Sequence, residues 1–314
     1  KGANASTITS TTHFFNVSNN LTVTQGNLIL QATDADYTIT NDLTVAANGT
    51  LTHSVNWDTY GKALVVNGSI AIDGIFTYTT RSTVWMKSAA AETVRTGANA
   101  ASAFSIFLLN NGSFTASGPL SINDNFWAMF GSAGSFHTST QTVTANAGVL
   151  INGGTVFIDG GTLNVTNGIQ VGYTNGLAST INLSSGTLNT DGVVVGAAAP
   201  ITATFTHSGG TANINGALTI FPTDAYNCTG SPVINIKGTW TNNGTFTPAT
   251  SQVNFTGTTP QSIAGSSFTT FNNLNIANAS GVTRATTTTG STNVNNTLNF
   301  SGGLITTGSN TLTV

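Results

Sequence analysis

Apolar and polar residues alternate over short stretches of this chain, and glycine separates one stretch from the next. The clearest example is GTLNTDGVVVG over residues 186–196, and similar phrases begin at Gly68, Gly112, Gly210 and Gly238. Alternation with a period of two predicts β-strands that point one row of side chains inward and the other row outward. The recurrence of one phrase indicates a repeat protein built from short strands.

The spacing of these phrases predicts how the strands are arranged. Anchors of the form Gly-x-apolar recur from Gly49 to Gly238 at intervals of about 25 residues, the length expected for one turn of a β-solenoid. The predicted fold is all-β, a parallel β-helix (β-solenoid) of roughly 12 turns that forms one domain over residues 1–314. Thr, Asn, Gly and Val dominate the composition, so helices should be nearly absent.

A β-sandwich or an up-and-down barrel is the alternative all-β fold. The paired strands of the repeat are short and are separated by a single glycine corner, which suits neither the long hairpin arms of a large barrel nor a Greek key. One interval breaks the rhythm, the 38 residues between Gly74 and Gly112. We expect a lateral insertion or loop over residues 79–104 in this interval, with room for one helical turn.

The repeat also predicts which residues face the core and which form corners. The inward column should contain Leu163, Val165, Leu188, Val193, Val195, Ile214, Leu218 and Ile220. The glycine corners should lie at Gly186, Gly192, Gly210, Gly216, Gly238 and Gly244. Asn precedes several glycines of the repeat, where it can supply a left-handed backbone and stack into amide ladders along the axis. These glycines are Gly49, Gly68, Gly112, Gly168, Gly216 and Gly244.

Charge excludes several classes of partner. The chain carries seven Lys and Arg and ten Asp and Glu, 5% of its residues, whereas soluble domains usually carry about 25%. Seven dispersed cations cannot form the basic track needed for nucleic acid or an anionic membrane surface, and no long apolar run predicts membrane insertion. The single cysteine, Cys228, excludes an intrachain disulfide and is expected to be a buried apolar residue.

The sequence offers little catalytic chemistry. Enzymes built on β-helices gather carboxylates on one face, but Asp159 and Asp191 each precede a glycine and are better explained as turn residues, with pairing across neighbouring turns left open. The four histidines lack ligand spacing, and Asp34, Asp36 and Asp42 lack the glycine-spaced pattern of a known calcium loop. We therefore expect no enzyme, no catalytic residue, no cofactor and no bound metal.

Three tryptophans, Trp57, Trp85 and Trp127, lie in the less regular middle of the chain near Tyr60 and Phe130. If these side chains are exposed, they form an adhesive or sugar-stacking patch. If they are buried, they fill the core, which is the interpretation that we favour.

The C-terminal residues 238–314 carry a more specific pattern. It consists of a Gln-x-Ile-x-Gly turn at 261–265, an aromatic-Asn-Asn-Leu-x-Ile strand at 271–276 and an Asn-x-x-Leu-x-Phe-x-x-Gly-x-Leu pair at 295–304. This segment resembles the repeats of large secreted surface proteins of the Bacteroidetes type. The resemblance implies an extracellular or cell-surface location, export by the type IX route, and an adhesive or scaffolding role.

Neither end of the chain contains a segment that resembles a solenoid cap. Exposed strand edges invite further strands, so we expect the ends to be occupied by the next repeats of a longer fibre or by another copy stacked head to tail in a filament. The expected function is an extracellular structural or adhesive solenoid whose partners are copies of itself and surface glycans. The alternative is a carbohydrate-binding or polysaccharide-degrading β-helix.

Overall fold

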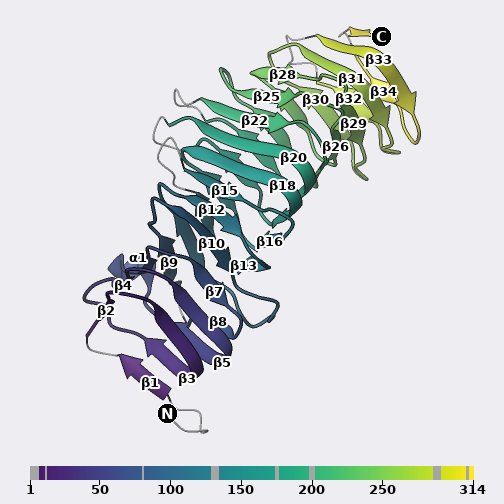
Figure 1. Ribbon diagram of the computed structural model, residues 1–314. Helices are drawn as coiled ribbons and strands as arrows, with labels where there is room; N and C mark the ends of the chain where they lie inside the picture. Colours follow the sequence, from purple (N-terminus) through teal and green to yellow (C-terminus); the bar gives the residue numbers. More distant parts are fainter. Residues whose placement is uncertain are drawn as a thin grey trace.

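The computed structural model describes residues 7–10, 13–79, 81–128, 134–173, 177–197, 202–285, 291–308 and 311–314. These residues form one elongated rod, with the N-terminus at one end and the C-terminus at the other (Figure 1). The strands pair in parallel with those of the turns before and after, in a 21-stranded sheet and a 14-stranded sheet. The prediction of a parallel β-solenoid of about 12 turns is confirmed.

The 14-stranded sheet takes one strand from each turn. Its strands are β2 (Asn16–Val17), β4 (Tyr37–Ile39), β6 (Ala63–Val66), β9 (Thr83–Met86), β11 (Ile106–Leu109), β14 (Phe126–Ala128), β17 (Val149–Ile151), β19 (Ile169–Val171), β21 (Val193–Val195), β24 (Leu218–Ile220), β27 (Trp240–Asn242), β30 (Gln261–Ala264), β32 (Val282–Arg284) and β34 (Ile305–Thr306).

The 21-stranded sheet supplies the rest of each turn. In the N-terminal half its strands are β1 (Thr7–Ser10), β3 (Leu21–Leu30), β5 (Leu43–His53), β7 (Ile70–Ile72), β8 (Ile75–Thr77), β10 (Ala91–Arg95), β12 (Ser113–Ala116), β13 (Leu120–Ile122), β15 (Ser135–His137) and β16 (Thr142–Ala145). In the C-terminal half they are β18 (Gly154–Val165), β20 (Ser179–Thr190), β22 (Ala203–His207), β23 (Thr211–Ile214), β25 (Ala225–Cys228), β26 (Val233–Ile236), β28 (Thr245–Thr247), β29 (Gln252–Phe255), β31 (Thr269–Ile276), β33 (Thr292–Phe300) and β35 (Leu312–Thr313).

The larger sheet bends around a corner and so forms two sides of the rod. The long strand β18 pairs with β15 through its first half and with β16 through its second half, and the pairing register shifts between the two halves. We call the strands aligned with residues 154–158 wall 1 and those aligned with residues 162–165 wall 2. The 14-stranded sheet is wall 3, and the core lies between the three walls.

The expected lateral insertion or loop at 79–104 is a wrong prediction for residues 81–95, which contribute two strands to the solenoid, whereas residues 96–105 connect β10 to β11. In this segment β9 lies between β6 and β11 in wall 3, and β10 pairs with both β7 and β12. The sequence TVWM places Val84 and Met86 in the core, so the segment contributes an ordinary turn despite its charges and alanines. The helix α1 (Trp57–Tyr60) precedes it, between the Asn56 cap and Gly61.

The long glycine interval has a different cause. Residues 91–94 of β10 pair with β12 in wall 1, and Val94 and Arg95 pair with β7 on the other side. Gly74 lies between β7 and β8, within the larger sheet, whereas Gly112 lies between β11 of wall 3 and β12 of wall 1. Gly74 and Gly112 therefore mark different corners, and their separation does not measure one turn.

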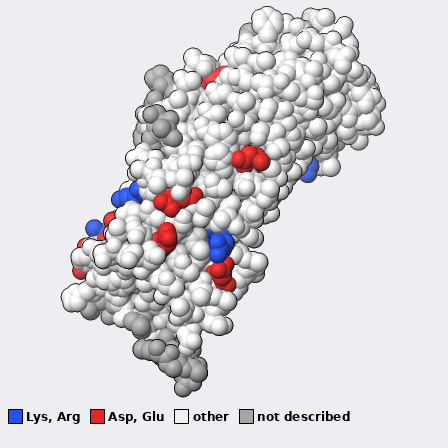
Figure 2. All heavy atoms as spheres, viewed as in Figure 1, with Lys and Arg blue, Asp and Glu red and all other residues white. Residues whose placement is uncertain are grey.

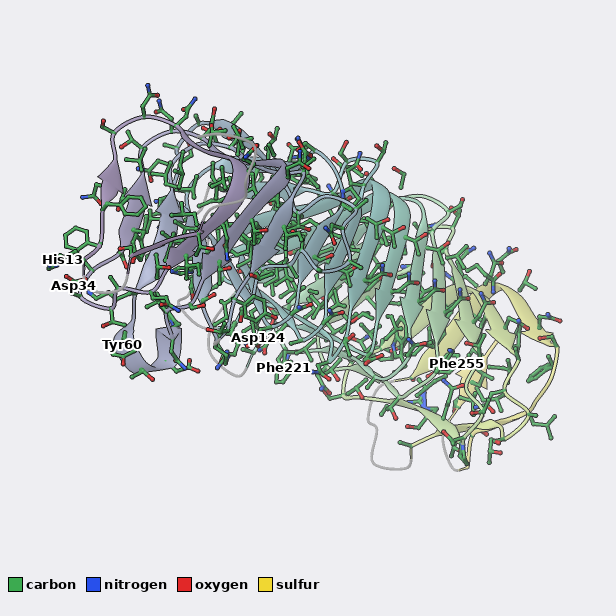
Figure 3. All side chains as sticks on the ribbon, turned by 90° about the horizontal axis from the view of Figure 1, so that it is seen from below. His13, Asp34, Tyr60, Asp124, Phe221 and Phe255 are labelled. Carbon is green, nitrogen blue, oxygen red and sulfur yellow. The ribbon has the colours of Figure 1, made fainter. Side chains whose placement is uncertain are left out.

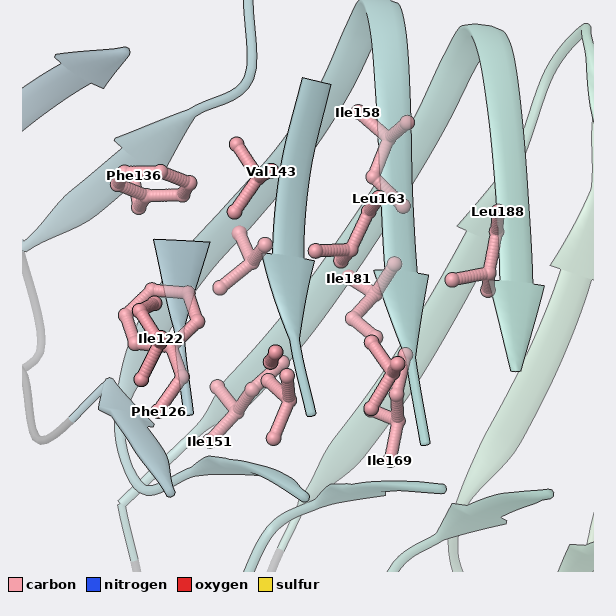
Figure 4. Close-up of a cluster of buried hydrophobic side chains, with 14 of the residues drawn as sticks. Ile122, Phe126, Phe136, Val143, Ile151, Ile158, Leu163, Ile169, Ile181 and Leu188 are labelled. Carbon is pink, nitrogen blue, oxygen red and sulfur yellow. The ribbon is translucent and has the colours of Figure 1, made fainter. Parts of the chain in front are cut away.

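The core repeats along the axis. Val143, Leu163 and Leu188 occupy the same register position in successive turns, and Figure 4 shows their side chains in a row across neighbouring strands. All eight residues of the predicted inward column are buried, and none exposes more than 4% of its surface. Burial of each such side chain contributes about 1.5–3 kcal/mol, so the repeated column is the main stabilising feature of the rod.

Most corner glycines are needed for close approach rather than for a left-handed backbone. Gly186 and Gly210 have positive φ values of 82° and 77°. The backbone does not have a positive φ at Gly192, Gly216, Gly238 and Gly244. A Cβ on Gly216 would lie 2.1 Å from the carbonyl oxygen of Asp191 in the preceding turn, so stacking of the turns excludes a side chain there.

Asparagine ladders form, but mainly in a different place from the predicted Asn-Gly corners. Wall 2 carries an outward row in which each asparagine Nδ2 donates to the Oδ1 of the asparagine in the preceding turn at 2.8 Å. This wall 2 ladder contains Asn164, Asn189, Asn213, Asn235 and Asn254. Its side chains are half-buried and satisfy one another along the axis.

Candidate functional site

From β6 to β21 the outward row of wall 3 is largely apolar, whereas Thr38 precedes this stretch and Thr219 and Thr241 follow it. The middle residues of these strands occupy one register position. Among the described side chains, this outer row contains Val65, Trp85, Leu108, Leu150, Gln170, Val194 and Thr219 in chain order. It contrasts with the Thr and Asn rows of wall 2, so the outer face of wall 3 is the candidate ligand-binding surface.

The N-terminal part of the outer row is covered. Trp57 of α1 packs edge-on against Trp85 at a ring-centroid distance of 6.5 Å, and the Lys87 Nζ lies 3.5 Å from the centroid of the Trp85 ring. Both tryptophans are half-buried, and Lys87 makes a cation–π contact with the one on β9. Trp57 and Trp85 therefore form a local packing cluster in place of an open aromatic patch.

The other aromatic residues predicted for a patch are placed only in part. Trp127 lies in β14, but its side chain is outside the described part of the structure, as is the whole of Phe130. Tyr60 is exposed on α1, and Figure 3 shows it at the side of the rod beside the small helix. The structure thus brings Trp57 and Trp85 together with Lys87 and leaves Tyr60 on the periphery.

The C-terminal part of the outer row is open and forms the floor of a groove with a volume of about 360 Å³. The floor side chains come from β17, β19, β21 and β24 in order, and the corners between walls 2 and 3 form the rim. The floor contains Leu150, Gln170, Val194 and Thr219, and the rim contains Asn167, Gly168, Asp191, Gly192 and Ala217.

Main-chain carbonyl groups at the rim of the groove hydrogen-bond to the neighbouring turns. The carbonyl oxygens of Gly168 and Gly192 accept the N–H groups of Val149 and Ile169 at 3.1 and 2.9 Å. The side chains are less engaged: Asp191 Oδ2 accepts the Asn167 N–H at 3.3 Å, and the Gln170 side chain has no hydrogen-bond partner among the described residues. The groove therefore offers polar side chains to a ligand and keeps its main chain for the fold.

Sequence reasoning missed the groove. Its floor residues are the middle positions of the triplets VLI, IQV, VVV and LTI, and these triplets contain few polar residues to reveal which side faces out. A comparison of the middle residues of these triplets across successive turns could have revealed the groove, because Leu, Gln, Val and Thr alternate there between apolar and polar.

Asp159 and Asp191, whose pairing across turns was left open, are not neighbours. Asp159 follows wall 1, where its Oδ2 lies 2.7 Å from His137 Nδ1 and its Oδ1 accepts the Ser139 N–H at 2.7 Å. The His137 ring stacks on Phe157 with a centroid distance of 4.3 Å. Asp191 follows wall 2 at a different corner, so these two carboxylates do not form an acid–base pair.

The N-terminal acidic residues serve the backbone of the next turn. Asp36 Oδ1 accepts the Ala63 N–H and Asp42 Oδ1 accepts the Ser69 N–H, each at 2.8 Å. Within the described ranges, no three His, Cys, Asp or Glu side chains converge in a metal-binding group. Asp36 and Asp42, two of the three aspartates considered for calcium, therefore accept hydrogen bonds from backbone amides of the next turn.

Charge is unevenly distributed along the rod. Arg81 forms ion pairs with Asp58 and Asp124, and Arg95 forms a bidentate pair with Asp73 at 2.9 Å. This arrangement holds the pKa of Asp73 below its usual value, mainly through the hydrogen bond from Arg95. Figure 2 shows charged residues over the lower and middle parts of the face in view, and few near the C-terminal end.

Several titratable groups are enclosed in the core. Burial lowers the pKa of His53 to about 3 and that of His207 to about 4, so both rings are neutral at pH 7. Cys228 is buried as predicted, and burial raises the pKa of its thiol to about 12. These groups are sealed from solvent and belong to the structural interior.

The C-terminal end of the described solenoid exposes core-type residues. Residues 297–300 of β33 pair with β31 on one side, whereas β35 pairs only with Thr292 and Asn293 on the other. Phe300 continues the inward column after Ile276, yet 48% of its surface is exposed, and Leu298 is half-buried. The neighbouring Leu304 is 74% exposed, which adds to an apolar surface across this end.

At the opposite end, residues 21–23 of β3 pair with β5 on one side, while β1 pairs with β3 only through residues 27–30. Leu21 is half-buried, Thr22 is exposed and Val23 is buried. This segment therefore has the same order of inward, outward and inward side chains as the end of β33.

In the described part of the chain, no helix is both long and apolar enough to cross a membrane. Compared with known protein families, curated proteins and solved structures, the chain shows no significant match to any of them.

Proposed function

We propose that this protein is an extracellular structural or adhesive β-solenoid whose rods associate end to end through exposed strand edges. The observation that carries the proposal is the open edge of β33, where the inward side chains Leu298 and Phe300 lie at the surface. Such an edge favours the addition of another parallel strand because it presents unpaired backbone groups beside apolar side chains.

The two ends have compatible patterns. Leu298, Asn299 and Phe300 alternate inward, outward and inward at the C-terminal edge, in the same phase as residues 21–23 at the N-terminal edge. A strand of one copy placed on the other would continue both the core and the outer row. This contact joins unlike surfaces, so it would repeat without closing and produce a filament.

The hydrogen bonding of the outward asparagine side chains also favours end-to-end association. Asn299 Nδ2 donates to Asn275 Oδ1 at 2.9 Å, while the Asn299 Oδ1 accepts from no described residue. The exposed Thr22 hydroxyl of a second copy would be a suitable donor for this oxygen. The low charge of the chain removes long-range repulsion between copies, and its resemblance to secreted surface repeats supports an extracellular location.

Sedimentation velocity over a concentration series, followed by negative-stain imaging, tests end association. We expect linear oligomers that lengthen with concentration, and we expect Leu298→Lys to remain monomeric because it places a charge in the new core. Thr245→Lys adds the same charge at an exposed position of β28 away from both ends, so it should assemble like the wild type. Thermal unfolding of each variant verifies that its rod is folded.

A wild-type protein that stays monomeric at every concentration would contradict the proposal. So would assembly of folded Leu298→Lys at the wild-type concentration. Oligomers whose images show side-by-side packing without end contacts would also contradict it.

A further inference from the structure

We propose that the groove on the outer face of wall 3 is a binding site for a neutral glycan. Its floor alternates along the rod between apolar Leu150 and Val194 and polar Gln170 and Thr219, on strands spaced about 4.8 Å apart. A pyranose ring presents apolar C–H faces and a rim of hydroxyl groups. This alternation therefore provides both the surface and the hydrogen-bonding groups that a sugar requires.

The polar side chains of the groove are available, unlike those of the neighbouring wall. In the wall 2 ladder, Asn213 both donates to Asn189 and accepts from Asn235. In the groove, the side chains of Gln170 and Thr219 have no hydrogen-bond partner among the described residues. A ligand can bind to these two groups without breaking bonds that stabilise the rod.

The charge of the lining selects the class of ligand. Asp191 is the one acidic residue among the lining residues, and Lys, Arg and His do not occur in the lining. Phosphates, sulfates and uronic acids would meet this carboxylate with no compensating cation. A neutral sugar instead can donate two adjacent hydroxyl groups to the Asp191 carboxylate, with Asn167 beside it on the same rim.

The shape of the groove favours a glycan over a peptide strand. An extended peptide binds to a sheet by pairing with a free strand edge. Here β19 pairs with both β17 and β21, and β21 also pairs with β24, so the groove floor has no free edge. The volume of about 360 Å³ lies near the lower limit of small-molecule pockets, which suits a short oligosaccharide segment bound on an open surface.

Isothermal titration of the intact chain with neutral hexasaccharides of glucose, mannose, galactose and N-acetylglucosamine tests the site. We expect at least one of these probes to bind with a Kd below about 1 mM, and we expect hexagalacturonate not to bind. Gln170→Ala and Thr219→Val should each weaken binding of that probe at least about tenfold. Thr206→Val removes a hydroxyl from the outer row of wall 1 and should leave the affinity unchanged.

Failure of every neutral probe to bind would overturn the proposal, as would equal loss of affinity in Gln170→Ala and Thr206→Val. Preferential binding of hexagalacturonate would also overturn it. The site is independent of end association, because it lies on the side of the rod. Repeating the titration with monomeric Leu298→Lys therefore separates the two proposals.

Discussion

His207 and Tyr226 meet inside the solenoid, with 2.9 Å between His207 Nδ1 and the Tyr226 hydroxyl oxygen. They come from β22 and β25 in neighbouring turns of wall 1, and both are completely buried. Burial lowers the pKa of His207 to about 4 and raises the pKa of Tyr226 well above its usual value, so neither group carries charge at pH 7.

This burial predicts that acid destabilises the protein before its carboxylates titrate. The unfolded state binds a proton at His207 with a pKa of 6.5, but the folded state does so only at about 4. Between these values the unfolded state binds more protons, so the free energy of unfolding falls as the pH is lowered. We expect His207 to contribute about 2 kcal/mol to the loss between pH 7 and pH 5, and His53 to add a similar amount.

Urea denaturation at both pH values measures this loss, and His207→Phe should reduce it by about half. The comparison uses the change with pH within each protein, so it tolerates a lower overall stability of the variant. An unchanged pH dependence in His207→Phe would show that the ring is already accessible to protons in the folded rod.

Substitutions at two corner glycines distinguish two reasons for glycine at a corner: close contact between successive turns, and formation of the corner itself. A Cβ on Gly216 would lie 2.1 Å from the Asp191 oxygen, whereas the nearest atom to a Cβ on Gly192 is the Ala217 oxygen at 3.3 Å. We expect Gly216→Ala to cost about 3 kcal/mol or more because the turns must separate, and Gly192→Ala to cost less than about 1 kcal/mol. Thermal and urea unfolding measure both; equal costs would contradict the stacked corner.

The period of the fold could be read from the sequence, but the identity of each wall could not. Leu163 and Leu188 alternate with polar neighbours, so their inward direction follows from the chain itself. In β10 the sequence AETVR alternates in the same way whichever strands it pairs with. The pairing of Val94 with both Ile70 and Ala116 joins three successive turns at one register position, which local alternation cannot reveal.

Neither the groove nor the position of the wall 2 ladder could be predicted from the sequence, and the reasons are related. In the triplet VVV at residues 193–195, an apolar middle residue gives no signal that Val194 faces outward. The ladder asparagines resemble the many asparagines at glycine corners, so composition alone does not show that Asn189 lies in the middle of a wall. Both features depend on which residues of successive turns share a register position.

The cysteine provides a test of interior access. Cys228 is buried in β25, and burial raises the pKa of its thiol to about 12, so both thiolate formation and access are suppressed in the folded rod. We expect almost no reaction with Ellman's reagent at pH 8 and complete reaction in denaturing urea. Thr245→Cys in a Cys228→Ala background is the exposed control and should react rapidly. Reaction of native Cys228 at the control rate would place the thiol outside the core.

The wall 2 ladder predicts a graded response to truncation. Asn213 donates to Asn189 and accepts from Asn235, each at 2.8 Å, whereas Asn164 at the start of the ladder accepts only from Asn189. Asn213→Ala should therefore cost about 1–2 kcal/mol of unfolding free energy and Asn164→Ala about half of that. Urea denaturation measures both costs, and the double variant tests whether they add. Equal costs at the two positions would mean that the amides act separately, because a connected ladder is weakened more by a break in its middle than by the loss of its end.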